Sequence, residues 1–202
     1  MIGVLLKKQL REQFAFLYRG KKGTVRSRGG AIALFVLLAF SYFSMAFGFF
    51  GISILLGEGL IGIGMDWFFF ALLAAIGFGL GLFGSVFITY NTLYKAKDNE
   101  FLLAMPIAPW KILFTRIAVL FGFTYLFEAL AVIPGMLGYF VVGGFSAATL
   151  VHSLILLPAT VLLTVALSCG LAYVVALIAG HIRHKQAAIV ILTLAFLTVY
   201  YV

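Results

Sequence analysis

The stretch GAIALFVLLAFSYFSMAFGFFGISILL, residues 30–56, carries no charged side chain over its whole length. As a helix, a stretch of this length can cross about 30 Å of hydrocarbon with some tilt. A bilayer leaves no water for unpaired backbone groups, so such a segment is expected to be helical. Comparable apolar runs follow along the chain, and the predicted spans are about 30–56, 67–90, 112–141, 150–180 and 187–202.

The composition supports the same fold class. The chain is 64% hydrophobic and 10% charged, whereas soluble domains are about 45–50% apolar and about 25% charged. So few charges could not cover a water-facing surface. The sequence therefore predicts an all-α polytopic membrane helix bundle with about five transmembrane helices, in a domain 30–202. It excludes a nucleic-acid-binding protein, although the net charge is +8.

The basic residues indicate an orientation. All 14 Lys and Arg residues lie in the N-terminal arm, in the segment 95–116 or at 183–185. The connections near 57–66 and 142–149 have none, and the first of them carries Glu58 and Asp66. Cytoplasmic loops carry an excess of Lys and Arg. The pattern predicts a multi-pass protein of the cell membrane with a cytoplasmic N-terminus.

The N-terminal arm, residues 1–29, has two parts. Apolar side chains recur at helical spacing over residues 1–18, and charged side chains lie between them; the apolar set is Ile2, Leu6, Leu10, Phe14 and Leu17. This pattern predicts an amphipathic helix at the membrane interface. The basic, glycine-rich stretch 20–29 is expected to bind anionic lipid headgroups, with docking to a partner protein as the alternative.

Two features inside the spans concern helix packing. Gly77, Gly81 and Ser85 are spaced by four in the second span. Small residues at this spacing let another helix backbone approach closely. Pro134, followed by Gly135, lies in the third span, where we expect a kink or a helix break.

Glu128 is the acidic residue deepest within a predicted span. A carboxylate in hydrocarbon costs on the order of 3 kcal/mol on insertion scales, so this side chain should face protein or a water-filled cavity. One interpretation is a buried Glu that is hydrogen-bonded to a neighbouring helix. The other is a residue of a substrate path or gate, together with Pro134.

Catalytic motifs are not found in the sequence. There is no H-E-x-x-H helix motif, no Cys pair and no phosphate-binding loop. His181 and His184 have a spacing that could bind a metal, but Arg183 and Lys185 beside them make a poor metal site. We therefore expect no catalytic residues, no metal and no cofactor, and no enzymatic activity of the chain by itself.

The loop after the second span has the most specific pattern. Asp98 and Glu100 can cap a short helix over residues 100–105, where carboxylates are favourable near the helix N-terminus. The apolar side chains of that helix are Phe101, Leu102 and Leu103. Pro106 and Pro109 end it, and Trp110 and Lys111 begin the next helix. The sequence thus predicts a short cytoplasmic helix held between two spans.

This segment resembles the loop after the second span of type-2 ABC exporter permeases. Members of that family have an acidic residue, then an LLxxP motif, and then basic residues where the helix of the third span begins. The residues at those positions are Glu100, Leu102, Leu103, Pro106, Ile107, Lys111 and Arg116. The N-terminal amphipathic helix is also a family feature, and residues 1–18 match it.

The resemblance implies that residues 98–106 form a coupling helix that contacts an ATP-binding subunit. Its contact residues would be Asp98, Glu100, Phe101, Leu102, Leu103 and Pro106. A second permease half or a homodimer is a further implied partner. The family usually has six spans, so five spans and an apolar C-terminal end favour a partial chain.

Two functions are therefore expected from the sequence. The first is a permease subunit of an ABC exporter that moves an unidentified substrate with ATP hydrolysed by a separate subunit. The alternative is a non-transport multi-pass membrane protein that acts as an assembly or sensory partner.

Overall fold

The computed structural model describes residues 2–15, 27–95 and 108–181, and these residues form helices and no strand. The elements are α1 (Ile2–Gln13), α3 (Arg28–Ile61), α4 (Asp66–Thr89), the π-helix η1 (Tyr90–Tyr94), α6 (Pro109–Gly143) and α7 (Ala147–His181). Four helices are long and apolar enough to cross a membrane: α3, α4 with η1, α6 and α7. The predicted all-α membrane bundle is confirmed to this extent. The fifth predicted span, 187–202, and the predicted short helix 100–105 lie outside the described residues.

The first connection is shorter than the sequence suggested. Helix α3 continues to Ile61, so Gly57 and Gly59 belong to the helix and not to a flexible turn. The turn itself is 62–65, where Gly64 has a φ of 73° that favours glycine. Gly57 is buried against Val142 of α6, where a Cβ atom would lie 3.4 Å from the valine side chain. Packing on α6 thus extends the helix beyond the glycines that favour a turn.

The expected helix break at Pro134 is not present. Helix α6 runs without interruption from Pro109 to Gly143 with Pro134 inside it, and α7 likewise contains Pro158. A proline removes one backbone hydrogen bond, but membrane helices tolerate this where neighbouring helices cover the site. Pro134 and Gly135 are both buried. A Cβ atom at Gly135 would lie 2.1 Å from Cδ1 of Leu73, so this glycine lets α4 pack closely beside the proline.

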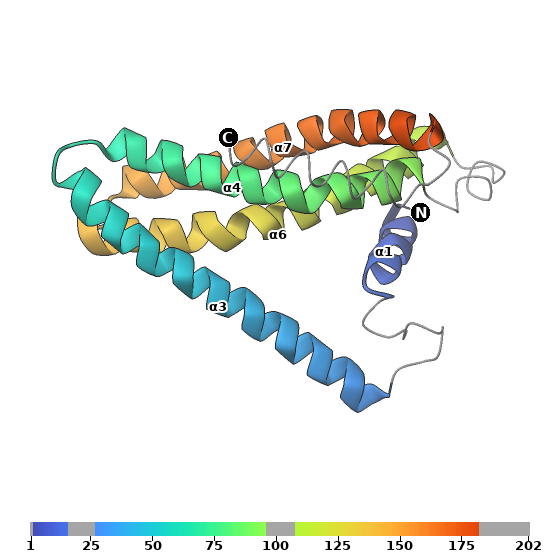
Figure 1. Cartoon of the computed structure of the whole chain (residues 1–202), viewed down its shortest axis with the longest axis horizontal. Helices are drawn as coiled ribbons and strands as arrows, with labels where there is room; N and C mark the ends of the chain where they lie inside the picture. The colour runs from blue at the N-terminus through green and yellow to red at the C-terminus, as the bar shows by residue number, and fades with distance from the viewer. Residues whose placement is uncertain (1, 16–26, 96–107, 182–202) are drawn as a thin grey trace.

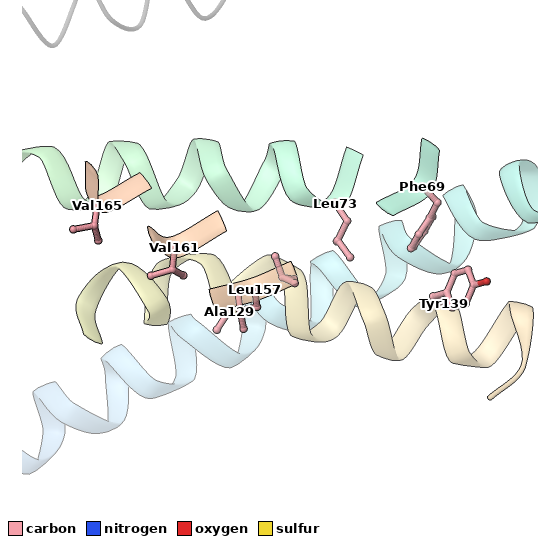
Figure 2. Close-up of a cluster of buried hydrophobic side chains, with 8 residues drawn as sticks. Phe69, Leu73, Ala129, Tyr139, Leu157, Val161 and Val165 are labelled. Atoms are coloured by element: carbon pink, nitrogen blue, oxygen red, sulfur yellow. The ribbon is translucent and has the colours of Figure 1, made fainter. Parts of the chain in front are cut away.

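Helices α4, α6 and α7 form the core of the molecule (Figure 1). Figure 2 shows a cluster of buried apolar side chains at their junction: Phe69 and Leu73 from α4, Ala129, Val132 and Tyr139 from α6, and Leu157, Val161 and Val165 from α7. Lipid is as apolar as these side chains, so van der Waals packing and interhelical hydrogen bonds stabilise such a junction. The cluster fixes which faces of the three helices point toward one another.

Helix α3 packs on α6 by its C-terminal part and diverges from the bundle toward its N-terminus (Figure 1). Ser53 Oγ donates a hydrogen bond of 2.6 Å to the carbonyl of Gly135, and Tyr42 donates one of 2.9 Å to the carbonyl of Leu126. Large apolar side chains nearer the N-terminus are exposed, including Phe35 and Phe40. In a bilayer these side chains would face lipid or another protein.

Helix α1 packs against α6, and its contact face differs from the one that the sequence indicated. The buried residues are Leu5 and Gln9, whereas Phe14 is 36% exposed. Leu5 contacts Ile112, and the rings of Phe14 and Phe123 have centroids 5.5 Å apart. The contact face thus adds Leu5 and Gln9 to the predicted apolar set, whose Leu6, Leu10 and Phe14 also line a hollow against α6. The polar Gln9 can occupy that face because α1 packs on protein as well as facing lipid.

The two ends of the bundle carry opposite charges. Lys95 at the end of η1, Lys111 at the start of α6 and helix α1 lie together at one end, which we call the basic end. Glu58 and Asp66 flank the α3–α4 turn at the other end, which we call the acidic end.

Candidate functional site

Glu128 lies at the junction of α4, α6 and α7, and its side chain is 0% exposed. Positions 116, 120, 124, 128 and 132 share one face of α6, and all five residues are buried. The contact with α4 and α7 therefore determines where the carboxyl group points. The Thr164 hydroxyl of α7 donates a hydrogen bond to Oε1 of Glu128.

Two glycines of α4 make room for this side chain. A Cβ atom at Gly81 would lie 2.6 Å from both Cγ and Oε1 of Glu128. A Cβ atom at Gly77 would lie 2.6 Å from a methyl carbon of Val132. Larger residues at either position would push α4 away from α6. Ser85, one turn further, is 1% exposed and takes part in the hydroxyl cluster described next.

Hydroxyl side chains lie on all three core helices at this junction, and two of them, Thr160 and Thr164 of α7, lie beside the carboxyl group. We call Ser85, Thr124, Thr160, Thr164 and Ser168 the hydroxyl cluster. The Oγ atoms of Ser85 and Ser168 form a hydrogen bond of 2.5 Å, in which either can be the donor. Thr160 lies beside the Glu128 carboxyl group. The three α7 members, Thr160, Thr164 and Ser168, are four apart, which places them on successive turns of one face of that helix.

Two oxygen atoms of the site lack a hydrogen-bond partner among the described residues. They are Oε2 of Glu128 and Oγ1 of Thr124, and both residues are 0% exposed. Side chains on a helix lean toward its N-terminus, so the Glu128 carboxyl group is directed toward the turn that carries Thr124. The site is thus a group of buried oxygen atoms with one ionisable carboxyl group.

Charged residues are absent from the surrounding helix segments. Residues 67–89 of α4 contain no Asp, Glu, Lys, Arg or His, and neither do residues 29–57 of α3. Helix α7 has only His152 among such residues between 148 and 180, near its start. In the described part of the chain, no group of three or more His, Cys, Asp and Glu residues could hold a metal ion. A single carboxyl group with hydroxyl neighbours can balance at most one positive charge.

A second polar region lies at the basic end. Nε2 of Gln13 in α1 donates a hydrogen bond of 2.8 Å to Oγ1 of Thr92 in η1. Helix α1 therefore contacts both η1 and α6, which flank residues 96–107 on either side. Thr89 and Arg116 are buried between this region and the hydroxyl cluster. Buried polar residues thus extend along the core from Glu128 to the basic end.

An apolar hollow of about 430 Å³ lies between α1 and α6. It is lined by Leu6, Leu10 and Phe14 from α1 and by Ala118, Val119, Gly122, Phe123 and Leu126 from α6. The exposed cations Lys7 and Arg11 follow Leu6 and Leu10 on the same helix. The hollow therefore lies beside a basic surface.

The structure brings together some of the predicted site residues. Glu128, Gly77, Gly81 and Ser85 meet at the α4–α6 contact, and Pro134 is buried further toward the acidic end of α6. The predicted ATPase contacts lie outside the described residues: Asp98, Glu100, Phe101, Leu102, Leu103 and Pro106. Sequence reasoning missed Thr124, Thr160, Thr164 and Ser168. Their spacing by four in α6 and α7 was visible, but only the fold shows that these faces meet.

Comparisons of the chain with protein-family models, with curated proteins and with solved structures find no match.

Proposed function

We propose that the chain is the membrane-spanning permease subunit of an ABC exporter, in the cell membrane, with its N-terminus in the cytoplasm. It would move an unidentified substrate with ATP hydrolysed by a separate subunit. The observation that best supports this proposal is the position of α1. This helix contacts both helices that flank residues 96–107, which resemble the coupling segment of type-2 exporter permeases.

The charge distribution supports the proposed orientation. Lys95, Lys111 and the cations of α1 lie at the basic end, and Glu58 and Asp66 lie at the acidic end. Lys and Arg are retained on the cytoplasmic side of membrane proteins. The basic end would therefore face the cytoplasm, where an ATPase subunit is found.

Helix α1 links the ends of the two helices that flank the proposed coupling segment. An ATPase that moves segment 98–106 would push on the ends of η1 and α6 together. Helix α1 holds these two ends through the Gln13–Thr92 hydrogen bond and the Leu5–Ile112 contact. The movement would therefore reach α4, α6 and α1 as one unit. The substrate path would lie between this chain and a second permease half or an identical copy.

The proposal is tested by recovery of the ATPase subunit in a pull-down with wild type and with Leu102→Asp at equal expression. An unpaired charge in an apolar docking groove should cost about 3 kcal/mol of association. Ala104→Asp is the matched control, because position 104 lies on roughly the opposite face of a helix over 100–105. We expect recovery to fall for Leu102→Asp and to persist for Ala104→Asp.

Equal recovery with all three chains would contradict the docking claim. It would favour the alternative of a non-transport membrane protein that acts as an assembly or sensory partner. That alternative shares the membrane topology but gives no role to Leu102.

A further inference from the structure

The carboxyl group of Glu128 has surroundings that suit a neutral acid better than an anion. An anionic carboxylate only accepts hydrogen bonds, and a buried one needs several donors or a cation. The Thr164 hydroxyl donates to Oε1 of this group, and Oε2 has no partner among the described residues. No cationic side chain lies on the facing segments of α3, α4 or α7.

The hydroxyl groups of the two threonines beside the carboxyl group are shared between Glu128 and the backbone of α7. The Thr160 hydroxyl lies 2.9 Å from the carbonyl of Leu157 and 3.1 Å from that of Leu156, so its hydrogen is directed to the backbone of α7. The Thr164 hydroxyl lies 2.9 Å from the carbonyl of Thr160 as well as facing Glu128. Hydroxyl groups in helices commonly bond backward in this way. Toward Glu128, the Thr164 hydroxyl donates to Oε1, and the Thr160 hydroxyl lies beside the carboxyl group while it also bonds to the backbone of α7.

The hydroxyl cluster continues toward the basic end. Ser85 and Ser168 are bonded to each other one turn beyond Gly81 and Thr164, and Thr124 lies one turn before Glu128 on α6. Thr89 follows on α4, and Thr92 is bonded to Gln13 at the basic end. Hydroxyl groups both donate and accept, so the bonded Ser85–Ser168 pair can pass a proton between its two oxygen atoms.

We propose that Glu128 is a proton-binding site of the packed α4–α6–α7 junction, supplied from the basic end through the hydroxyl side chains of these helices. Loss of the proton leaves a buried carboxylate whose Oε2 has no hydrogen-bond donor among the described residues and which faces no cation on the adjoining segments of α3, α4 and α7. The packed junction would then be destabilised and would open to water. Protonation of Glu128 thus favours the packed arrangement. This inference does not depend on an ATPase partner.

Other titratable groups on the packed elements lie away from this carboxyl group. They are Arg28, Tyr42 and Glu58 on α3, Asp66 on α4, Tyr90 and Tyr94 in η1, Lys111, Arg116, Tyr125 and Tyr139 on α6, His152, Cys169, Tyr173 and His181 on α7, and Lys7, Lys8, Arg11 and Glu12 on α1. Helix α4 has none between residues 67 and 89. Tyr42 bonds to the carbonyl of Leu126, and the α1 charges are exposed at the basic end.

The test uses dicyclohexylcarbodiimide, an apolar reagent that reacts with protonated carboxylic acids, on the purified full chain in liposomes. Peptide mass spectrometry locates the label among the six Asp and Glu residues. We expect Glu128 to be labelled at low pH and the labelling to be lost as the pH rises. A water-soluble carbodiimide should label exposed Glu58 and leave Glu128 unmodified. Glu128→Gln should abolish the label at this position.

Infrared spectroscopy gives a second measurement that does not require reagent access. The wild type should show a protonated-carboxyl C=O band that is missing in Glu128→Gln. In D₂O, hydrogen–deuterium exchange of this carboxyl proton, seen as a shift of the band, should be slower in Ser85→Ala/Ser168→Ala than in the wild type. Ser153→Ala, whose hydroxyl bonds to the carbonyl of Thr149, should exchange like the wild type.

Two results would overturn the proposal. The first is the absence of both the Glu128 label and the Glu128-dependent band at every pH. The second is protection of Glu128 by sodium but not by choline at constant pH, which would identify a metal-cation site in place of a proton site.

Discussion

Thr164 of α7 donates a hydrogen bond to Glu128 of α6, and this bond joins the deepest acidic side chain of the described bundle to a neighbouring helix. Gly81 of α4 leaves the space that the Glu128 carboxyl group occupies. The three helices therefore depend on one another at this point. A substitution at any of these three residues should therefore disturb the packing of all three helices.

Gly81→Ala should destabilise the bundle by roughly 1–3 kcal/mol, because the new methyl group would lie 2.6 Å from Glu128 and force α4 outward. Gly79→Ala is the control, since a Cβ atom there meets nothing within 4 Å. The measurement is unfolding by SDS in mixed micelles. Equal midpoints for the two variants would show that α4 and α6 do not approach this closely.

Helix α1 should cross-link to α6 through engineered cysteines. In a Cys169→Ser background, Leu5→Cys with Ile112→Cys should form a disulfide on mild oxidation, because these two side chains are in contact. Val4→Cys with Ile112→Cys is the control, since Val4 is 74% exposed. Non-reducing electrophoresis after cleavage between the two positions detects the bond. Cross-linking of both pairs alike would contradict the docked position of α1.

Labelling of single cysteines should reveal the proposed topology. In a Cys169→Ser background, Ile63→Cys and Phe145→Cys should react with an impermeant reagent added outside intact cells. Lys95→Cys should react only after the membrane is permeabilised. The physical reason is the retention of Lys and Arg on the cytoplasmic side. Reaction of Ile63→Cys from the cytoplasm alone would reverse the orientation.

Anionic lipid should stabilise the basic end through Lys7 and Arg11. Each cation near an anionic surface contributes about 1 kcal/mol. In nanodiscs, replacing neutral lipid with anionic lipid should raise the unfolding midpoint of the wild type more than that of Lys7→Gln/Arg11→Gln. High salt should remove the difference, because it screens exposed charges. An equal rise in unfolding midpoint for the wild type and for Lys7→Gln/Arg11→Gln at low salt would exclude these two residues from lipid binding.

Much of the fold could be predicted from the sequence. The uncharged run 30–56 and its successors required helices, because a backbone in hydrocarbon must satisfy its own hydrogen bonds. Four of the predicted spans correspond to α3, α4, α6 and α7. The boundaries were less accurate, since Gly57 and Gly59 favour a turn by propensity and lie in α3 through packing on α6. Of the two outcomes predicted at Pro134, a kink or a helix break, the break does not occur, because α6 is continuous through this residue.

The sequence by itself determined that Glu128 must be shielded from lipid, because a lone carboxylate in hydrocarbon is costly. It also determined which loops are basic, and hence the predicted orientation. Only the tertiary structure decided what shields the carboxyl group: Gly81 from α4, and Thr160 and Thr164 from α7. Spacing by four identifies a face of one helix, but it contains no information on which face of another helix lies opposite. That choice is made by close packing between α4, α6 and α7, which depends on side-chain shapes brought together from distant parts of the chain.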